Sequence, residues 1–391
     1  MKKKILFFLT TLFTGGTEKA AIAYLNELAA TGKYEIILCV MFKVTTKKTL
    51  EYSIDKTVTI IYFSSDTIGN RLNEMLIGFS NGYWGRIKYA AFRLKYNFLF
   101  RKKFDEVITT YRPTTIIQAD SVMPDYFQKY DNLTKIIFVH FSIDHIFSHF
   151  FKAYRIKNWL KKLKNYDQVI AVSRGVYLQM EELGLTKNLH LLYNPFFENQ
   201  IKLRAQEPYT LPPGVKENNY IISVARLDEN QKDFTSLINA LALIRKKYGV
   251  VYNLVILGDG RDHLTLEKLV MDLGLYASVF FMGVQPNPYP YIANSSLFVL
   301  SSKFEGFGIV LLEALLLDKL VISSNCYTGP EEILNHEKLL VPVGDAEAMA
   351  DAIYNLLTDQ PLQAEIYKHL HSQKKIFDPL PSIQGLESLL K

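Results

Sequence analysis

The sequence holds only two cysteines in 391 residues, Cys39 and Cys326. Each lies in or beside an apolar run, which fits reduced thiols of a cytosolic protein rather than a disulfide framework. No apolar run approaches the roughly 18 residues that a membrane-spanning helix needs. The N-terminal sequence MKKKILFFLTTLFTGG resembles a secretion signal, but its apolar run is short and no small-residue cleavage site follows. We therefore expect it to form the first buried strand.

Acidic residues are missing from two segments of the first half of the chain. Tyr83 to Lys103 and Phe151 to Lys164 contain aromatic and basic residues but no Asp or Glu. The basic residues are Arg86, Lys88, Arg93, Lys95, Arg101, Lys102 and Lys103, then Lys152, Arg155, Lys157, Lys161, Lys162 and Lys164. This pattern predicts helices on a membrane surface, where anionic lipid attracts each Lys or Arg by about 1 kcal/mol. A solvated helix face over a core stripe is the alternative. Nucleic acid is a weaker one, because no recognition motif accompanies the charge.

The length of the chain suggests two domains, and the hydrophobic pattern repeats accordingly. Apolar runs typical of strands alternate with helical patterns, which predicts parallel sheets and an α/β fold. The expected strands span residues 5–9, 35–41, 58–62, 115–118, 135–139, 168–172 and 190–193, then 220–224, 252–257, 279–281, 297–300, 320–323 and 339–341. A more polar, Pro-containing stretch from Phe196 to Lys216 is the expected hinge. The sequence thus predicts two doubly wound sheets whose ligands bind at the carboxyl ends of the strands.

The stretch from Leu297 to Leu317 combines a buried strand, a glycine-rich loop and an apolar helix. Glu305 lies in the loop, and Glu313 is the lone carboxylate on the helix. Since a buried carboxylate is costly without partners, Glu313 must lie at a helix edge, contact a donor group of the protein, or contact a ligand. A strand, a glycine-rich loop and a helix N-terminus form an anion site. This arrangement suits a ligand with polar ends and a phosphate middle, such as a sugar nucleotide. The alternative is a buried βα unit with a capped loop.

The sequence EGFGIVLLEAL, in which Glu305 and Glu313 are separated by seven residues, resembles family 4 of the retaining glycosyltransferases with two Rossmann domains. The resemblance covers nearly the whole chain. It implies a GT-B fold, with two Rossmann-like doubly wound parallel-sheet domains facing a central cleft. Residues 1–200 would form the N-terminal acceptor-binding domain and residues 201–376 the C-terminal domain that binds the nucleotide-sugar donor. Residues 377–391 would cross back to the first domain.

The resemblance also implies roles for residues of the second half. Glu305 would contact hydroxyls of the donor sugar, and Glu313 the ribose of the nucleotide. Backbone amides of Gly306, Phe307 and Gly308 would approach the diphosphate. Arg226 and Lys232 resemble the family's phosphate-binding pair, at a spacing one residue longer than the commonest form. Such cations would stabilise the charge that builds on the leaving phosphate.

In the first half, Gly15, Gly16 and Glu18 resemble the family's Gly-Gly-x-Glu opening. The glycine amides would face the donor, and Glu18 would cap its helix. His140 matches a histidine near the transferred sugar, although a structural role is the alternative. The triplet Asp-x-Asp, common in metal-dependent transferases, occurs nowhere in the chain. We expect no metal and no other cofactor. A trio of His140, Asp144 and His145 is a weak alternative metal site.

The expected function is metal-independent retaining transfer of a hexose or N-acetylhexosamine from a nucleotide donor, with UDP favoured. The acceptor would be a saccharide or a lipid-linked saccharide in polysaccharide or lipopolysaccharide biosynthesis. We expect a cytoplasmic protein, peripheral on the inner face of the membrane. A catalytically silent partner of another transferase is an alternative, which intact Glu305, Arg226 and Glu313 count against. A sugar-nucleotide epimerase or a phosphorylase on the same fold is a third reading.

Overall fold

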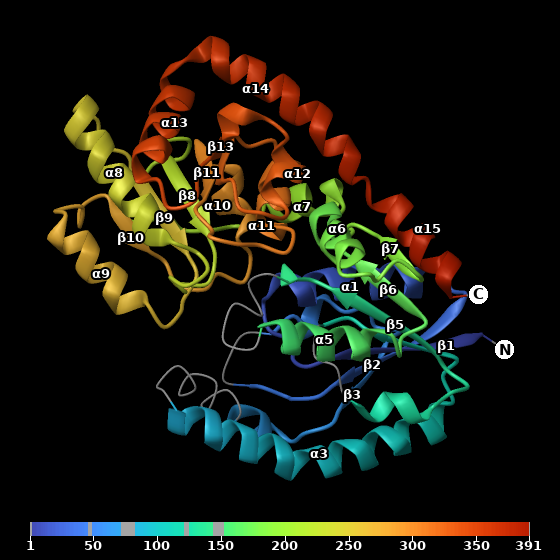
Figure 1. Cartoon of the computed structure of the whole chain (residues 1–391). Coiled ribbons are helices and arrows are strands. Elements are labelled where there is room, and N and C mark those ends of the chain that lie inside the picture. Colours follow the sequence, from blue (N-terminus) through green and yellow to red (C-terminus); the bar gives the residue numbers. More distant parts are fainter. Residues whose placement is uncertain (1, 46–48, 72–82, 121–124, 144–151, 391) are drawn as a thin grey trace. The chain divides into compact units, whose positions relative to one another are not determined.

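The computed structural model describes residues 2–45, 49–71, 83–120, 125–143 and 152–390. The chain divides into two compact units. Unit 1 comprises Met1–Val172, Val176–Pro195 and Pro379–Lys391, and unit 2 comprises Ser173–Gly175 and Phe196–Asp378. Each unit is built around one parallel sheet with helices beside it (Figure 1). The predicted α/β class with two doubly wound sheets is confirmed.

Unit 1 has a seven-stranded parallel sheet in the order β3-β2-β1-β4-β5-β6-β7. The chain order reverses between β1 and β4, which is the kind of point where open sheets bind ligands. Buried Ile, Leu, Val and Phe side chains fill the central strands because both faces of the sheet are covered. The strands are β1 Lys3–Leu9, β2 Tyr34–Val40, β3 Thr59–Tyr62, β4 Thr115–Gln118, β5 Thr134–Val139, β6 Gln168–Ala171 and β7 Leu189–Leu191.

The register of the sheet decides which helices share a face. Phe8 pairs with Gln118, and Gln118 pairs with Ile137, so these three side chains point to one face. The helix α3 (Tyr83–Tyr111) packs there through Phe104, whose ring centroid lies 6.5 Å from that of Phe8. The helix α5 (Lys152–Leu163) packs there through Trp159, in one cluster with Ile137. Helices α3 and α5 therefore cover the same face.

Other elements complete unit 1. The helix α1 (Gly16–Ala30) covers the opposite face, where Tyr24 contacts Phe138 at a ring-centroid distance of 5.0 Å. The last helix, α15 (Pro379–Leu389), lies against unit 1, and Lys3 Nζ donates to the carbonyl of Leu390 at 3.2 Å. In the described part of unit 1, the other helical elements are α6 Arg174–Glu182 and the short turns η1 Glu51–Ser53 and η2 Asp125–Lys129.

Unit 2 has a six-stranded parallel sheet in the order β10-β9-β8-β11-β12-β13, with its reversal between β8 and β11. Its strands are β8 Tyr220–Val224, β9 Asn253–Leu257, β10 Val279–Phe281, β11 Leu297–Leu300, β12 Val321–Ser324 and β13 Leu340–Val341. Its helices are α7 Glu198–Arg204, α8 Phe234–Tyr248, α9 His263–Asp272, α10 Tyr289–Ala293, α11 Ile309–Leu316, α12 Pro330–Leu334, α13 Ala346–Thr358 and α14 Gln360–Gln373, with the turns η3 Glu337–Leu339 and η4 Lys374–Phe377.

One segment adds a helix to the sequence-based expectation, and the cysteines agree with it. The segment from Phe196 to Lys216, the expected hinge, begins with the helix α7, which was not predicted. Glu198 in its first turn and two basic residues in its last turn complement the helix dipole. Both cysteines are buried and unpaired, as expected for reduced thiols. Within the described ranges, every helix is too short or too polar to cross a bilayer.

Candidate functional site

The predicted residues of unit 2 come from two loops that leave neighbouring strands. Arg226 and Lys232 follow β8, and Glu305 follows β11, which pairs with β8 in the sheet. The first loop leads to α8 and the second to α11, so they diverge at the point where the strand order reverses. In an open parallel sheet, the crevice between two such loops is the expected ligand site. Sequence reasoning placed these three residues in one site, and the strand order brings them to one edge.

Glu305 is held by partners from both loops. Its carboxylate forms an ion pair with the ammonium of Lys232 and accepts a hydrogen bond from Ser302 Oγ at 2.6 Å. Both charged side chains are largely buried, so the ion pair is shielded from solvent. A buried pair of this kind repays its desolvation only with good geometry and further hydrogen bonds. Ser302 supplies such a bond and was not singled out from the sequence.

Hydrogen bonds tie the two loops together. Ser301 Oγ donates to the carbonyl of Lys232 at 2.8 Å, and Lys303 N donates to the carbonyl of Gln231 at 2.7 Å. Gln231 in turn accepts a bond from Arg226 at 3.1 Å. The Arg226 side chain is 64% exposed, and its nearest described carboxylate, that of Asp228, lies 3.7 Å away. The loops therefore form one unit that holds Lys232 inside and presents Arg226 to solvent.

Close packing around two glycines supports these loops. A Cβ built on Gly258 would lie 1.8 Å from the carbonyl oxygen of Ala225, and the φ of Gly258 is +143°. A Cβ on Gly329, whose φ is +87°, would lie 2.0 Å from the carbonyl oxygen of Phe307. Only glycine fits either position, because backbone atoms occupy the space of a side chain. The segment around Gly329, to which sequence reasoning gave no role, thus braces the loop before α11.

Thr328 gives that brace a second contact, because its hydroxyl donates to the backbone carbonyl of Glu305. Phe307 is buried and packs on Phe377, with ring centroids 5.7 Å apart. Gly308, with φ +89°, is the N-cap of α11 and has no side chain to cover the helix end. The amides of Gly306 to Gly308 therefore lead directly into the positive end of a helix, where an anion is favoured.

Glu313 is one of the most buried carboxylates of the chain, with 1% of the residue exposed. Tyr289 Oη donates a hydrogen bond to Glu313 Oε1 at 2.8 Å. Of the three possibilities posed by the sequence, the structure therefore shows a donor group of the protein. The guanidinium of Arg204 lies 5.0 Å from the centroid of the Tyr289 ring. Tyr289 was missed because nothing in the sequence links α10 to a carboxylate 24 residues further on.

In unit 1, Gly15 and Gly16 follow β1 and begin α1. The carboxylate of Glu18 folds over Gly15, since a Cβ built there would lie 2.3 Å from Glu18 Oε2. Glu18 Oε1 also accepts a hydrogen bond from Thr11 Oγ1 at 3.3 Å. Glu18 therefore holds the loop between β1 and α1.

His140 follows the end of β5, and its ring stacks on Phe138 at a centroid distance of 5.9 Å. Burial lowers the pKa of His140 to about 4, against a hydrogen bond with the backbone of Ala119 that raises it. The imidazole is therefore neutral near pH 7 and offers hydrogen bonds rather than charge. Asp144 and His145, the other members of the conceivable metal trio, lie outside the described residues. No group of three His, Cys, Asp or Glu side chains suited to a metal occurs in the described part of the chain.

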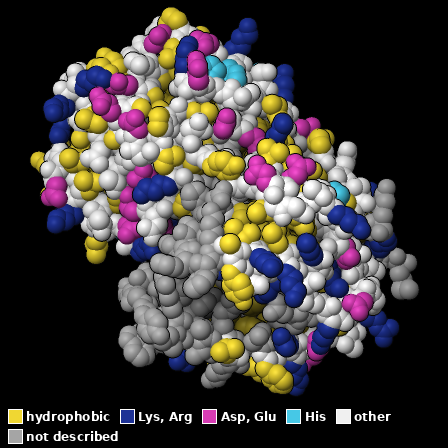
Figure 2. Space-filling view, viewed as in Figure 1, with side chains coloured by type: hydrophobic (Ala, Val, Ile, Leu, Met, Phe, Trp, Pro, Cys, Tyr) yellow, Lys and Arg dark blue, Asp and Glu magenta, His cyan; other side chains and the backbone are white. Residues whose placement is uncertain are grey.

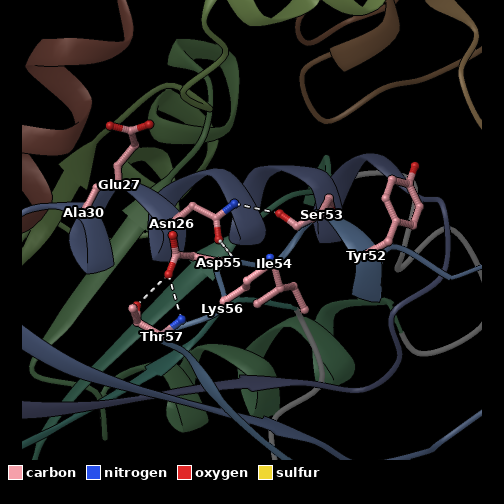
Figure 3. Close-up of a pocket in the computed structure, with 9 residues that line it drawn as sticks. All are labelled: Asn26, Glu27, Ala30, Tyr52, Ser53, Ile54, Asp55, Lys56 and Thr57. Atoms are coloured by element: carbon pink, nitrogen blue, oxygen red, sulfur yellow. Dashed lines mark hydrogen bonds between the residues drawn. The ribbon is translucent and has the colours of Figure 1, made fainter.

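A shallow cavity of about 530 Å³ lies on unit 1, lined by the second half of α1 and by residues 52–57 (Figure 3). Its polar groups bond to one another: Asn26 donates to the carbonyl of Ser53 at 2.8 Å and accepts from Asp55 N at 2.8 Å. The cavity lies before the start of β3, at the amino end of the sheet. None of the predicted site residues lines it, so it is separate from the candidate site.

Comparison with known proteins adds independent findings. Residues 212–372 match the family model described as Glycosyl transferases group 1. A curated relative from Campylobacter jejuni, N-acetylgalactosamine-N,N'-diacetylbacillosaminyl-diphospho-undecaprenol 4-alpha-N-acetylgalactosaminyltransferase, is 31% identical over 194 residues. That alignment covers 49% of this chain and 50% of the relative, so the chain matches about half the length of that protein. A second transferase from the same organism, an alpha-1,4-N-acetyl-D-galactosaminyltransferase, is 25% identical over 389 residues, 96% of this chain and 94% of its own.

Solved structures resemble the chain over nearly its whole length. Anabaena HepE in complex with UDP and glucose superposes with a TM-score of 0.74 at 20% identity, covering 99% of both chains. Staphylococcus aureus TarM, in a complex with UDP, also has a TM-score of 0.74, at 14% identity and 99% coverage of both chains. At these identities the likeness shows the fold alone. The comparisons therefore show the GT-B fold for the whole chain and a match to the glycosyltransferase family model over residues 212–372.

Proposed function

We propose that this protein is a metal-independent, retaining glycosyltransferase that takes a hexose or N-acetylhexosamine from a nucleotide donor bound to unit 2. The observation that carries the proposal is the placement of Arg226, Lys232 and Glu305 at the carboxyl ends of two paired strands. Two cations beside a glycine-rich loop and a helix N-terminus suit a diphosphate. A carboxylate at the same place suits the hydroxyls of a sugar.

Donor binding would exchange partners within the site. In the structure, Glu305 neutralises Lys232. A donor diphosphate would bind the ammonium of Lys232 in place of Glu305, and would also bind the exposed guanidinium of Arg226. The carboxylate of Glu305, still oriented by Ser302, would then accept hydrogen bonds from the donor sugar. Tyr289 holds Oε1 of the buried Glu313, so contact of the other carboxylate oxygen with a ribose would require that side chains other than Tyr289 shift on binding.

The transfer step needs charge stabilisation more than a protein base. The bond between the anomeric carbon and the phosphate oxygen breaks, and the electron pair leaves with the nucleotide. The acceptor hydroxyl attacks the same face of the sugar and passes its proton to the departing phosphate, so the configuration is retained. Arg226 and Lys232 would stabilise the developing negative charge in place of a metal. Neutral His140 could contribute a hydrogen bond near the transferred sugar without adding a charge.

The donor and acceptor classes are inferred from the sequence and its relatives. UDP is the favoured nucleotide, in line with the UDP-bound structures of HepE and TarM. The names of both Campylobacter relatives describe N-acetylgalactosaminyl transfer to undecaprenol-linked saccharides. An acceptor saccharide linked to a lipid diphosphate therefore fits this chain. The protein would then work at the cytoplasmic face of a membrane.

A transfer assay tests this proposal. Purified protein is incubated with labelled UDP-hexoses and UDP-N-acetylhexosamines, a lipid-linked saccharide acceptor and a chelator. We expect acceptor-dependent release of UDP and a product with the anomeric configuration of the donor, read by NMR. Release of UDP only with added metal, or an inverted product, would contradict the mechanism. Donor binding without transfer to any acceptor would favour the silent partner, and acceptor-independent turnover would favour an epimerase.

A further inference from the structure

The two helices formed largely by segments that lack acidic residues lie on one face of the sheet of unit 1. The helices α3 and α5 cover the same face of its sheet, as the strand register shows. From the sequence alone, residues 83–103 and 151–164 could have lain on opposite faces. The outward sides of both helices therefore lie on the same side of this sheet. Residues 83–103 and 151–164 hold basic residues and no acidic ones, whereas the whole chain has 45 Lys and Arg against 39 Asp and Glu.

The outward side of α3 exposes large apolar side chains that the core does not use. Leu94 is 75% exposed and Phe98 is 74% exposed, whereas Phe100 and Phe104 are buried against the sheet. Leu94 and Phe98 are four residues apart, and Lys102 follows at the same interval on the same side. Single exposed apolar residues need no explanation, but here two large ones share a stripe with a lysine.

The outward side of α5 repeats this combination. Tyr154 is 66% exposed, and Lys157 and Lys161 are exposed beside it, while Trp159 and Leu163 are buried. Lys157 and Lys161 are four residues apart, so they lie on one side of the helix. Figure 2 shows Lys and Arg side chains next to hydrophobic ones in the region of α5.

We propose that Leu94, Phe98 and Lys102 of α3, with Tyr154, Lys157 and Lys161 of α5, form a docking face for an anionic lipid bilayer. Positive charge attracts anionic headgroups, and apolar side chains beside it enter the boundary between headgroups and acyl chains. Aliphatic Leu94 favours lipid over nucleic acid, because a base stacks on aromatic or guanidinium planes. The docking face deepens the proposed function, which rests on a lipid-linked acceptor, but lipid binding itself does not depend on catalysis.

The test is co-sedimentation of the full chain with vesicles of phosphatidylcholine containing phosphatidylglycerol, and with vesicles of phosphatidylcholine alone. We expect binding to the anionic vesicles only, weakening as salt is raised. The double variants Lys157→Glu/Lys161→Glu and Leu94→Ser/Phe98→Ser should each bind roughly tenfold or more weakly. The matched controls in unit 2 are Lys246→Glu/Lys268→Glu and Leu264→Ser/Met271→Ser, all at exposed positions, and should bind like the wild type.

Several results would overturn the docking face. These are equal binding to both vesicle types, wild-type binding by both unit 1 variants, or tighter binding to an oligonucleotide than to anionic vesicles. A thermal shift with UDP is recorded for every variant as a check on folding and on the donor site. If UDP raises the melting temperature of none of the proteins while the wild type binds the anionic vesicles and the unit 1 variants do not, the proposed transferase fails and the docking face stands. If UDP raises the melting temperature of every protein but none of them binds the vesicles, the docking face fails and the proposed donor site stands.

Discussion

Tyr289 donates a hydrogen bond to Glu313 across 2.8 Å in the interior of unit 2. The two residues come from α10 and α11, which follow one another in the chain on either side of β11. A carboxylate buried in an apolar helix is thereby given a donor, which it needs to be tolerated there. The same contact fixes the orientation of the carboxylate that we propose to meet the nucleotide.

Removing the Tyr289 hydroxyl should therefore affect stability and donor binding together. In Tyr289→Phe the ring stays under Arg204, but Glu313 loses its donor. We expect the free energy of unfolding to fall by about 1–3 kcal/mol. The KM for the donor should rise with little change in kcat, because the contact orients a binding group. The control Tyr276→Phe alters an exposed tyrosine of the same unit and should change stability by no more than about 0.5 kcal/mol. An unchanged donor KM in Tyr289→Phe would contradict the positioning role.

The buried pair of Lys232 and Glu305 predicts a non-additive response to mutation. Lys232→Met leaves an unpaired buried carboxylate and should destabilise unit 2 by about 3–5 kcal/mol. The double variant Lys232→Met/Glu305→Gln should regain much of that stability, since no buried charge remains unpaired. Its transfer activity should stay about 100-fold or more below wild type, because the cation is missing.

Thermal unfolding and the transfer assay measure the two effects separately. Lys338→Met serves as the matched control, since it breaks an exposed ion pair with Glu365 and should cost at most about 1 kcal/mol. Recovery of activity along with stability in the double variant would assign the pair a structural role only.

The environment of His140 predicts a dependence of stability on pH. The pKa of His140 in the folded protein is about 4, below its ordinary value of 6.5. Between these two values the unfolded chain binds more protons, so stability is fully present above pH 6.5 and falls as the pH drops toward 4. His140→Asn, which cannot titrate there, should remove this part of the pH dependence. An NMR titration of the His140 ring should have its midpoint well below the ordinary value, and a midpoint near 6.5 would be inconsistent with burial.

Replacing Gly258 with alanine should lower the stability of unit 2 by more than its backbone angle alone would, because the new methyl group would also clash with the backbone. Gly258→Ala places a methyl group against the Ala225 carbonyl, next to Arg226, and should cost more than about 3 kcal/mol. Gly214→Ala is the matched control, because Gly214 has φ +83° but no heavy atom within 4 Å of the point where a Cβ would lie. That change should cost only about 1 kcal/mol. If Gly258→Ala and Gly214→Ala lowered the free energy of unfolding equally, the loop around Ala225 would have moved to accommodate the methyl group, contrary to the prediction.

Much of the fold could be predicted from the sequence because buried parallel strands appear as apolar runs between turn residues. The strands at 115–118, 220–224, 279–281 and 297–300 have the bounds that were expected. The helix α3 runs on to Tyr111, beyond the expected end near Phe104, since Val107 continues its buried side. The helix α7 was missed because its seven residues are too few to show a hydrophobic period.

The candidate site could be predicted as a set of residues but not as a set of contacts. Glu305 and Lys232 are 73 positions apart, and their pairing depends on β8 and β11 being neighbours. Likewise, Ser302, Thr328 and Tyr289 acquire their roles from packing between elements, which no local pattern encodes. Local spacing singled out candidate side chains, and the topology of the sheet determines which of them meet.

Binding of UDP to the wild type and to Glu313→Gln, measured by isothermal titration with a chelator present, tests the central claim most directly. The account predicts that UDP binds the wild type without metal, more tightly than GDP or ADP, and about tenfold or more weakly to Glu313→Gln, the loss of roughly one hydrogen bond to a charged group. Failure of every nucleotide to bind the folded wild type would contradict a donor site in unit 2. Equal binding by both proteins would remove Glu313 from that site.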